Sequence, residues 1–303
     1  MSRSWLAPFF LLASVWGGSF LFIKVSLDDL APIQIAFLRC AIGAAVLFAA
    51  LAIRRESVPR EPRLWAHLTV AALLLNAVPF TLFGYGEQHA SSVLAGIWNG
   101  TTPLFAVVFV WLALPDEPPT RAGVAGLVIG FIGVVLVLGP WSLDGGSAFS
   151  SQLMFAGAAA CYGASFAYSR RYISHRETSG LALAAIQVLL GALILVPLLP
   201  IAGMPDGDLG ADTALAMLAL GALGTGLAYV LYHEIVRRAG ATSASTVTYV
   251  IPVFSTILGV LVLGERVHWH EPAGAAIVLL GVAIAQERLG PARTRANSPS
   301  SSV

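Results

Sequence analysis

The feature that most constrains this chain is an apolar stretch, Ser91–Leu114, that carries polar residues and a proline near its middle. At about 1.5 Å of rise per helical residue, it is long enough to cross a lipid bilayer. A second stretch, Gly240–Gly264, follows the same plan, so that Pro103 in the first corresponds to Pro252 in the second. The chain therefore contains an internal repeat, and each copy places a proline at the depth of the bilayer.

A proline inside a helix removes the hydrogen bond to the carbonyl four residues earlier, which here belongs to Asn99 and to Thr248. Hydrocarbon cannot satisfy a freed carbonyl, so protein or a water-filled cavity must do so. Interrupted helices at matched positions in two halves indicate the binding site of a transporter. The alternative is that both prolines only kink their helices for packing.

Composition excludes a soluble globular domain. Of 303 residues, 57% are hydrophobic and only 11% are charged, whereas a soluble domain carries roughly a quarter charged residues. The net charge of +1 favours no nucleic-acid partner. Cys40 and Cys161 both lie in apolar stretches and are interpreted as packing residues, and no metal, phosphate-loop or cofactor motif occurs. We expect an integral membrane protein of the bacterial cytoplasmic-membrane type, with no cofactor and no enzymatic activity.

Ten apolar stretches are separated by short charged or Gly/Pro-rich connections, and each predicts a membrane-spanning helix. The first is interpreted as a retained helix rather than a cleaved signal peptide. The expected helices are Trp5–Ile23, Ile33–Ile53, Leu64–Gly86, Ser92–Leu114, Ala122–Leu138, Leu153–Ser169, Leu181–Ile201, Thr213–Tyr232, Thr242–Leu263 and Pro272–Gln286.

The distribution of basic residues predicts the orientation. If the N-terminus is cytoplasmic, 14 of the 17 Lys and Arg residues fall on the cytoplasmic side; only Lys24 and Arg266 fall outside, and Arg39 lies within a span. Basic residues concentrate in cytoplasmic loops. Both termini are therefore expected in the cytoplasm, which requires an even number of helices.

The repeat extends over most of the chain. Trp16-Gly17-Gly18-Ser19-Phe20 in the first helix corresponds to Tyr162-Gly163-Ala164-Ser165-Phe166 in the sixth, and Arg39 in the second corresponds to Gln187 in the seventh. Five helices per copy force the second copy to enter the membrane from the opposite face, and such inverted repeats are typical of alternating-access carriers. The expected division is a first five-helix repeat at residues 5–139, a second at 152–287 and a disordered cytoplasmic tail at 288–303.

These residues resemble the EamA-type branch of the drug/metabolite transporter superfamily. The similarity rests on the Trp-Gly-Gly-Ser-Phe stretch, on Arg39, and on Pro252 followed by Gly264-Glu265-Arg266; the first copy departs from that last pattern, reading Pro115-Asp116-Glu117-Pro118. The resemblance implies an all-α membrane protein with ten helices as two inverted five-helix repeats. It also implies export or exchange of a small metabolite, such as an amino acid, through a central cavity.

Candidate cavity residues share small or polar character at helical spacing, or aromatic character in equivalent helices. Both patterns also occur in ordinary helix packing. The candidates are Asn99, Thr102 and Pro103 in the fourth helix, Thr248, Tyr249, Pro252 and Ser255 in the ninth, Trp16 and Ser19 in the first, Tyr162 and Ser165 in the sixth, and Tyr229 in the eighth.

Ionisable residues in or at the ends of spans are candidates for a gate. Arg39 could bind a substrate carboxylate, close a gate with Asp28 or Asp29, or extend toward the interface. Lys24 offers the same alternatives, and Glu87 and Glu234 are either proton-sensing gate residues or solvated helix ends.

We therefore expect a secondary transporter whose partners are a small-molecule substrate and the lipid bilayer. A channel and a non-transporting membrane sensor or scaffold are the competing hypotheses. The glycine face that includes Gly126 and Gly130 could pack within the fold or between protomers, so a homodimer stays open.

Overall fold

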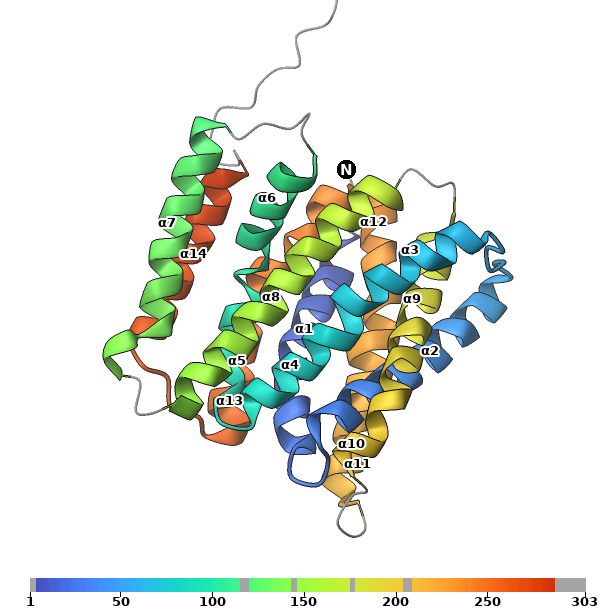
Figure 1. Ribbon diagram of the computed structural model, residues 1–303, viewed down its shortest axis with the longest axis horizontal. Coiled ribbons are helices and arrows are strands. Elements are labelled where there is room, and N and C mark those ends of the chain that lie inside the picture. The colour runs from blue at the N-terminus through green and yellow to red at the C-terminus, as the bar shows by residue number, and fades with distance from the viewer. Residues whose placement is uncertain (1–3, 115–119, 143–145, 175–177, 204–208, 287–303) are drawn as a thin grey trace, which may run out of the picture.

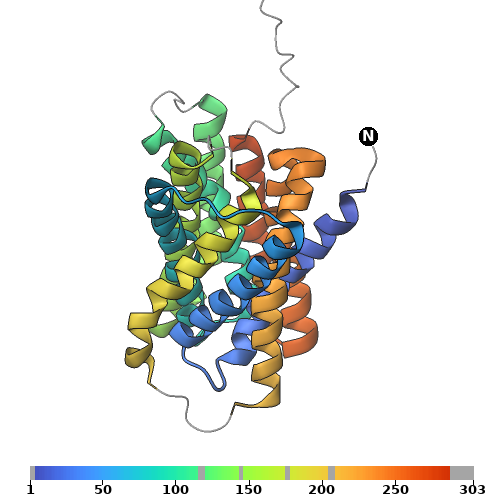
Figure 2. The same cartoon turned by 90° about the vertical axis from the view of Figure 1, so that its right-hand side faces the viewer.

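The chain forms a bundle of helices that run side by side in Figure 1, and Figure 2 shows the same bundle from the side, with some helices inclined to the others. The structure is a computed structural model that describes residues 4–114, 120–142, 146–174, 178–203 and 209–286. Within these ranges every regular element is a helix, and no strand occurs.

Helices occupy each range expected from the sequence, several of them in two or three segments. The first half contains α1 (Leu6–Ser26), α2 (Pro32–Arg54), α3 (Pro62–Ala72), η1 (Leu73–Ala77), α4 (Val78–Glu87), α5 (Ser92–Asn99), α6 (Thr102–Ala113), α7 (Arg121–Leu138) and η2 (Pro140–Ser142). The second half contains α8 (Gly146–Tyr172), α9 (Gly180–Leu195), η3 (Val196–Leu198), α10 (Leu199–Ala202), α11 (Ala211–Leu218), η4 (Ala219–Leu227), α12 (Ala228–Ser245), α13 (Val247–Leu263) and α14 (His270–Ala285).

Eight helical stretches among the described residues are long and apolar enough to cross a bilayer, counting α3–α4, α5–α6, α9–α10 and α11–α12 as one stretch each. The others are α1, α2, α7 and the stretch that ends with α13, while α14 is a shorter apolar helix. Large apolar side chains, among them Leu112, Val128 and Leu261, are exposed on the outside of the bundle. An apolar exterior of this extent suits contact with lipid, and the protein is a multi-pass integral membrane protein.

Two helices widen into π-helical segments at comparable places in the two halves. In η1 the segment leads directly to Pro79, whose ring would clash with the carbonyl of Leu75 in a regular α-helix. In η4 the hydroxyl of Thr225 donates to the carbonyl of Leu220 at 3.3 Å, five residues earlier. π-Helical turns are rare and concentrate at functional sites.

The interruption expected at Pro103 is present, because α5 ends at Asn99 and α6 begins at Thr102. The second copy differs. Pro252 lies inside the continuous helix α13, and the interruption comes earlier, at Thr246 and at Gly240, whose φ of 83° is left-handed. Because α13 begins at Val247, the carbonyl opposite Pro252 belongs to its first turn, where the backbone can bend away without breaking the helix.

Helices α5 and α13 cross in direct contact through residues without bulky side chains. A Cβ atom on Gly100 would lie 2.8 Å from Cγ of Pro252, and one on Gly96 would lie 1.9 Å from Oγ of Ser255. A Cβ atom on Gly17 of α1 would likewise lie 2.5 Å from Cβ of Phe254 in α13. Helix α5, which precedes the interruption at Pro103, therefore packs directly against the proline-bearing helix α13.

Helices α7 and α14 form a close pair at one side of the bundle, where they lie together in Figure 1. Gly126 and Gly133 of α7 face the backbone of Gly281 and Gly274 of α14, so a Cβ on Gly126 would lie 2.3 Å from the backbone nitrogen of Ala285. The glycine face recognised in the sequence is thus used within the chain. Backbone cannot yield as a flexible side chain can, so this contact depends on glycine.

We expect Gly126→Leu to separate α7 from α14 and to lower stability by about 1–3 kcal/mol, because the added side chain meets backbone. The measurement is the thermal midpoint of the purified protein in detergent. Val128→Leu, on the exposed face of the same helix, serves as the control and should leave the midpoint unchanged. Equal midpoints for both variants would contradict the close α7–α14 contact.

Candidate functional site

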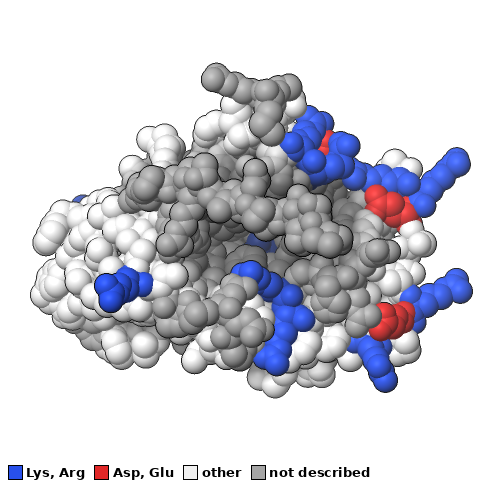
Figure 3. Space-filling model, turned by 90° about the horizontal axis from the view of Figure 1, so that it is seen from above, with Lys and Arg blue, Asp and Glu red and all other residues white. Residues whose placement is uncertain are grey.

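The two ends of the bundle differ in charge and in closure. The end seen in Figure 3 is hollowed near its middle, and blue Lys and Arg side chains border the hollow. We call this the basic end; it includes Arg237 and Arg238 of α12 and Arg121 at the start of α7. The opposite end carries the connections that follow α1, α4, α10 and α13.

Side chains hold the connections together at the opposite end. Nζ of Lys24 donates to the carbonyls of Glu87 (2.5 Å) and Ala90 (2.9 Å), which ties α1 to the turn between α4 and α5. The carboxylate of Glu265, after α13, accepts from the backbone nitrogens of Ser92 and Val93 at 2.8 and 3.0 Å. These nitrogens are free donors at the N-terminus of α5, where a negative charge is favourable.

A third contact at this end joins the two halves. Oδ2 of Asp29 accepts from the backbone nitrogen of Gly210 at 2.9 Å, immediately before α11. Hydrogen bonds from the side chain of Thr213 and from this backbone nitrogen lower the pKa of Asp29 below its ordinary value. The carboxylate therefore keeps its charge, and this contact, down to a more acidic pH than a free aspartate would.

A polar cluster lies inside the bundle where each half meets a π-helical segment of the other. Nε of Arg39 in α2 donates to Oγ1 of Thr225 in η4 at 3.0 Å. Nε2 of Gln187 in α9 donates to Oδ1 of Asn76 in η1 at 2.9 Å. Arg39 and Gln187 are the residues that correspond in the two repeats, so the second hydrogen bond reproduces the first across the repeat symmetry.

Aromatic side chains surround this polar cluster. The guanidinium carbon of Arg39 lies 3.8 Å from the ring centroid of Phe80. Tyr162 of α8 and Tyr229 of α12 are close enough to Arg39 to interact with it electrostatically. The structure thus brings together three residues that the sequence proposed separately, Arg39, Tyr162 and Tyr229.

The candidates of the fourth helix lie at its interruption. Asn99 is half-buried at the end of α5, and Thr102 and Pro103 are buried at the start of α6. The Thr102 hydroxyl has no hydrogen-bond partner. This unpaired hydroxyl leaves a donor and an acceptor available beside the crossing of α5 and α13.

The hydroxyl groups of the candidates in α13 donate hydrogen bonds to other groups of the protein. Oγ1 of Thr248 donates to the carbonyl of Ser245 at 2.8 Å, and Oγ of Ser255 donates to the carbonyl of Pro252 at 3.0 Å. The Tyr249 hydroxyl donates to Oε1 of Gln286 at 2.7 Å, just after α14. Tyr249 therefore lies apart from the polar cluster.

The remaining candidates border the centre on α1 and α8. The ring of Trp16 lies 6.0 Å from that of Tyr232 in α12. Ser19 is buried and donates to the carbonyl of Val15 at 3.1 Å, while Gly224 of η4 packs against its hydroxyl oxygen. Ser165 of α8 is buried as well.

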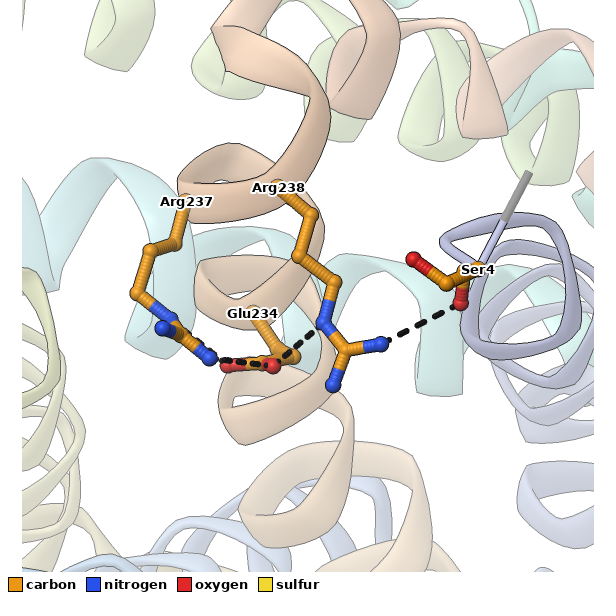
Figure 4. Close-up of polar contacts among 4 residues, drawn as sticks. All are labelled: Ser4, Glu234, Arg237 and Arg238. Carbon is orange, nitrogen blue, oxygen red and sulfur yellow. Dashed lines mark hydrogen bonds and ion pairs between the residues drawn. The ribbon is translucent and has the colours of Figure 1, made fainter. Parts of the chain in front are cut away.

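The two glutamates considered for gating have different surroundings. Glu87 is completely buried, and neither carboxylate oxygen has a hydrogen-bond partner. Glu234 instead pairs with Arg237 at 2.6 Å and Arg238 at 2.5 Å on α12, and Arg238 also donates to the carbonyl of Ser4, as Figure 4 shows. Glu234 thus belongs to an ion-paired cluster at the basic end that holds the start of the chain against α12.

Sequence reasoning missed Asn76, Gln187, Thr225 and Glu265 as site residues. Asn76 stands alone in the apolar run Leu73–Val78, and Gln187 occupies the position equivalent to Arg39. These were usable signals, because an isolated polar residue in a membrane helix needs a partner. Nothing in the local sequence indicated that the partners come from the opposite half.

We expect Gln187→Leu to lower stability by about 1–3 kcal/mol, because it leaves the Asn76 amide buried without a partner. Adding Asn76→Leu should restore part of the loss, since both groups are then apolar. Thermal midpoints of the single and double variants measure this coupling. The exposed Gln88→Leu is the control, and strictly additive effects would disprove a direct interaction.

Relatives with the same overall length are named as transporters. The chain is 28% identical over 281 residues to an uncharacterized transporter of Archaeoglobus fulgidus, covering 88% of this chain and 92% of the relative. It is 26% identical over 283 residues to the uncharacterized inner membrane transporter YedA of Escherichia coli, covering 91% and 88%. A probable terminal-alkyne amino-acid exporter of Streptantibioticus cattleyicolor is 25% identical over 295 residues, covering 95% of each chain.

A solved structure supports the same assignment. One crystal structure superposes on 96% of this chain and 100% of its own with a TM-score of 0.66 and 25% sequence identity. The sequence model of the EamA-like transporter family matches twice, at residues 3–139 and 149–285. With nearly the whole chain matched, and membrane helices around a polar centre, the protein is a membrane transporter that belongs to the EamA-like transporter family.

Proposed function

We propose that the protein is a secondary transporter that exports a small organic metabolite, such as an amino acid, by alternating access. The observation that carries this proposal is the pair of equivalent hydrogen bonds, Arg39 to Thr225 and Gln187 to Asn76. Each bond joins a polar side chain of one half to a polar side chain of the other inside an apolar bundle. Polar groups at that depth are expensive unless they serve packing or a substrate path. The relative named as a probable amino-acid exporter supports the substrate class.

The proposal includes ten membrane crossings with both termini in the cytoplasm, arranged as two inverted five-helix repeats at 5–139 and 152–287. Here α8 and α14 are the sixth and tenth crossings. The basic end then faces the cytoplasm, which agrees with the concentration of Lys and Arg in cytoplasmic loops. The tail at 288–303 lies outside the described residues.

The substrate path runs from the hollow at the basic end to the polar cluster. Its walls are formed by the aromatic and polar candidates around α1, α5, α8 and α12. Of these, Trp16 and Asn99 are only partly buried, and the Thr102 hydroxyl has no hydrogen-bond partner among the described residues. In the conformation described, Lys24 and Glu265 hold the opposite end together. Release of these contacts, with closure of the basic end, would complete a transport cycle.

Glu87 is the residue best suited to couple this closure to protons. Its carboxylate is fully buried without a hydrogen-bond partner in the described chain, and Lys24, Glu265 and Arg39 act on it electrostatically. A carboxylate in such a position is more stable when protonated. Opening of the Lys24 contact would expose it to solvent and allow it to ionise.

The test is flux in proteoliposomes across a panel of labelled amino acids and related metabolites. A carrier gives saturable uptake that is accelerated by substrate on the opposite side, whereas a channel gives current without such acceleration, and a sensor gives neither. Asn99→Leu and Thr248→Leu should each reduce the rate without loss of folded protein, with Val128→Leu as the control. Absence of saturable flux for every compound would refute the proposal.

Cysteine labelling tests orientation and closure. The chain has only Cys40 and Cys161, so both can be replaced by serine before single cysteines are introduced. With an impermeant maleimide on intact cells, Gln88→Cys should react at once, whereas Ser57→Cys and Asn99→Cys should react only after the membrane is permeabilised. Labelling of Ser57→Cys in intact cells would reverse the orientation, and no labelling of Asn99→Cys under either condition would remove it from the path.

A further inference from the structure

The strongest unexplained feature of the polar cluster is an excess of hydrogen-bond donors. Arg39 is only 7% exposed, yet within the described chain its guanidinium uses one nitrogen, Nε, for a hydrogen bond, to Thr225. It stacks on Phe80, and no carboxylate of the described residues lies within ion-pair distance. The two terminal nitrogens, which carry four N–H groups, meet no acceptor in the part of the chain that the structure describes.

Asn76 adds a second open donor from another helix. It is fully buried, and its carbonyl oxygen is occupied by Gln187, but Nδ2 has no hydrogen-bond partner. The Tyr229 hydroxyl lies beside Asn76 and near Arg39, although it does not reach Nδ2 in hydrogen-bond geometry. Gly191 lies against both Asn76 and Cys40, the residue next to Arg39, which places the two donors on neighbouring helices.

A largely buried cation whose terminal nitrogens meet no acceptor, and a buried amide nitrogen with none, are costly unless something supplies oxygen atoms. The planar guanidinium of an arginine can donate two parallel hydrogen bonds to the two oxygens of a carboxylate. An amide N–H can donate a further hydrogen bond to the same carboxylate. Glu87 interacts with Arg39 electrostatically but forms no hydrogen bond or ion pair with it in the described chain. Tyr162 and Tyr229 provide flat, mainly apolar walls for the rest of a ligand.

We propose that Arg39 and Asn76 form a carboxylate-binding subsite, so that the transported solute carries a carboxylate and a largely apolar body. This inference rests on the proposed transport function, since it names the substrate class of the same site. It excludes cationic amines and neutral nucleosides as principal substrates. Gln187 and Thr225 then act as positioning residues that hold Asn76 and Arg39 in place.

The experiment measures binding directly, by calorimetry on the purified protein in detergent, with four matched probes. They are L-phenylalanine, 3-phenylpropionate, L-phenylalaninamide and phenethylamine, of which only the first two have a carboxylate. We expect binding by one or both carboxylates and affinities at least about tenfold weaker for the amide and the amine. Preferred binding of the amide or amine, or no binding of either carboxylate, overturns the proposal.

Variants assign the effect to the subsite. Arg39→Gln should weaken carboxylate binding by at least about tenfold, and Asn76→Leu by less, because the amide is uncharged. Arg39→Lys keeps the charge but loses the fork, and Arg54→Gln, exposed at the end of the same helix, is the control. Thermal midpoints verify that each variant is folded, and unchanged affinity in folded Arg39→Gln and Arg39→Lys overturns the assignment.

The two proposals fail in different ways. Saturable flux of a solute without a carboxylate, unaffected by Arg39→Gln, would leave the transport function standing and refute the subsite. Carboxylate binding that depends on Arg39 with no flux of any bound compound would uphold the subsite and refute the transport function.

Discussion

The low polarity of a membrane interior governs this molecule, because every polar group inside the bundle must find a partner there. The chain satisfies several of them across the boundary between its halves. Arg39 depends on Thr225, Asn76 on Gln187, and the N-terminus of α5 on Glu265. Each of these pairs joins residues more than 100 positions apart. The halves are thus connected by polar contacts at the centre and at both ends, since Arg238 also donates to the carbonyl of Ser4 at the basic end.

The π-helical segments explain how the central contacts are possible. A wider turn shifts a side chain relative to the regular α-helical faces and frees local hydrogen-bonding groups. Asn76 lies in η1 and Thr225 lies in η4. The Thr225 hydroxyl donates to the carbonyl of Leu220 within that π-helical segment. The two polar pairs then lie on opposite sides of the same interface. A local irregularity in each half is therefore used to build one shared centre.

Much of the fold followed from the sequence, because the length of an apolar run is a direct consequence of bilayer thickness. Helices lie in all ten expected ranges, and the interruption before Pro103 was predicted from the chemistry of proline alone. Pro252 shows the limit of that reasoning, since the cost of a proline depends on where its helix begins, and α13 begins only five residues earlier. The site was less accessible. Tyr249 resembled a cavity residue but bonds to Gln286, and the partners of Arg39 and Asn76 are set by tertiary packing, which no local pattern records.

The capping of α5 by Glu265 has a consequence for synthesis of the chain. Ribosomes deliver the first half to the membrane before residue 265 is made. The backbone amides of Ser92 and Val93 therefore lack their acceptor, Glu265, which is translated 173 and 172 residues later, respectively. Arg39 and Asn76 likewise lack their hydrogen-bond partners, Thr225 and Gln187, until those residues have been translated. The N-terminal half therefore lacks these partners until they have been made, and a nascent chain stalled before Gln187 would hold its first helices without the polar centre.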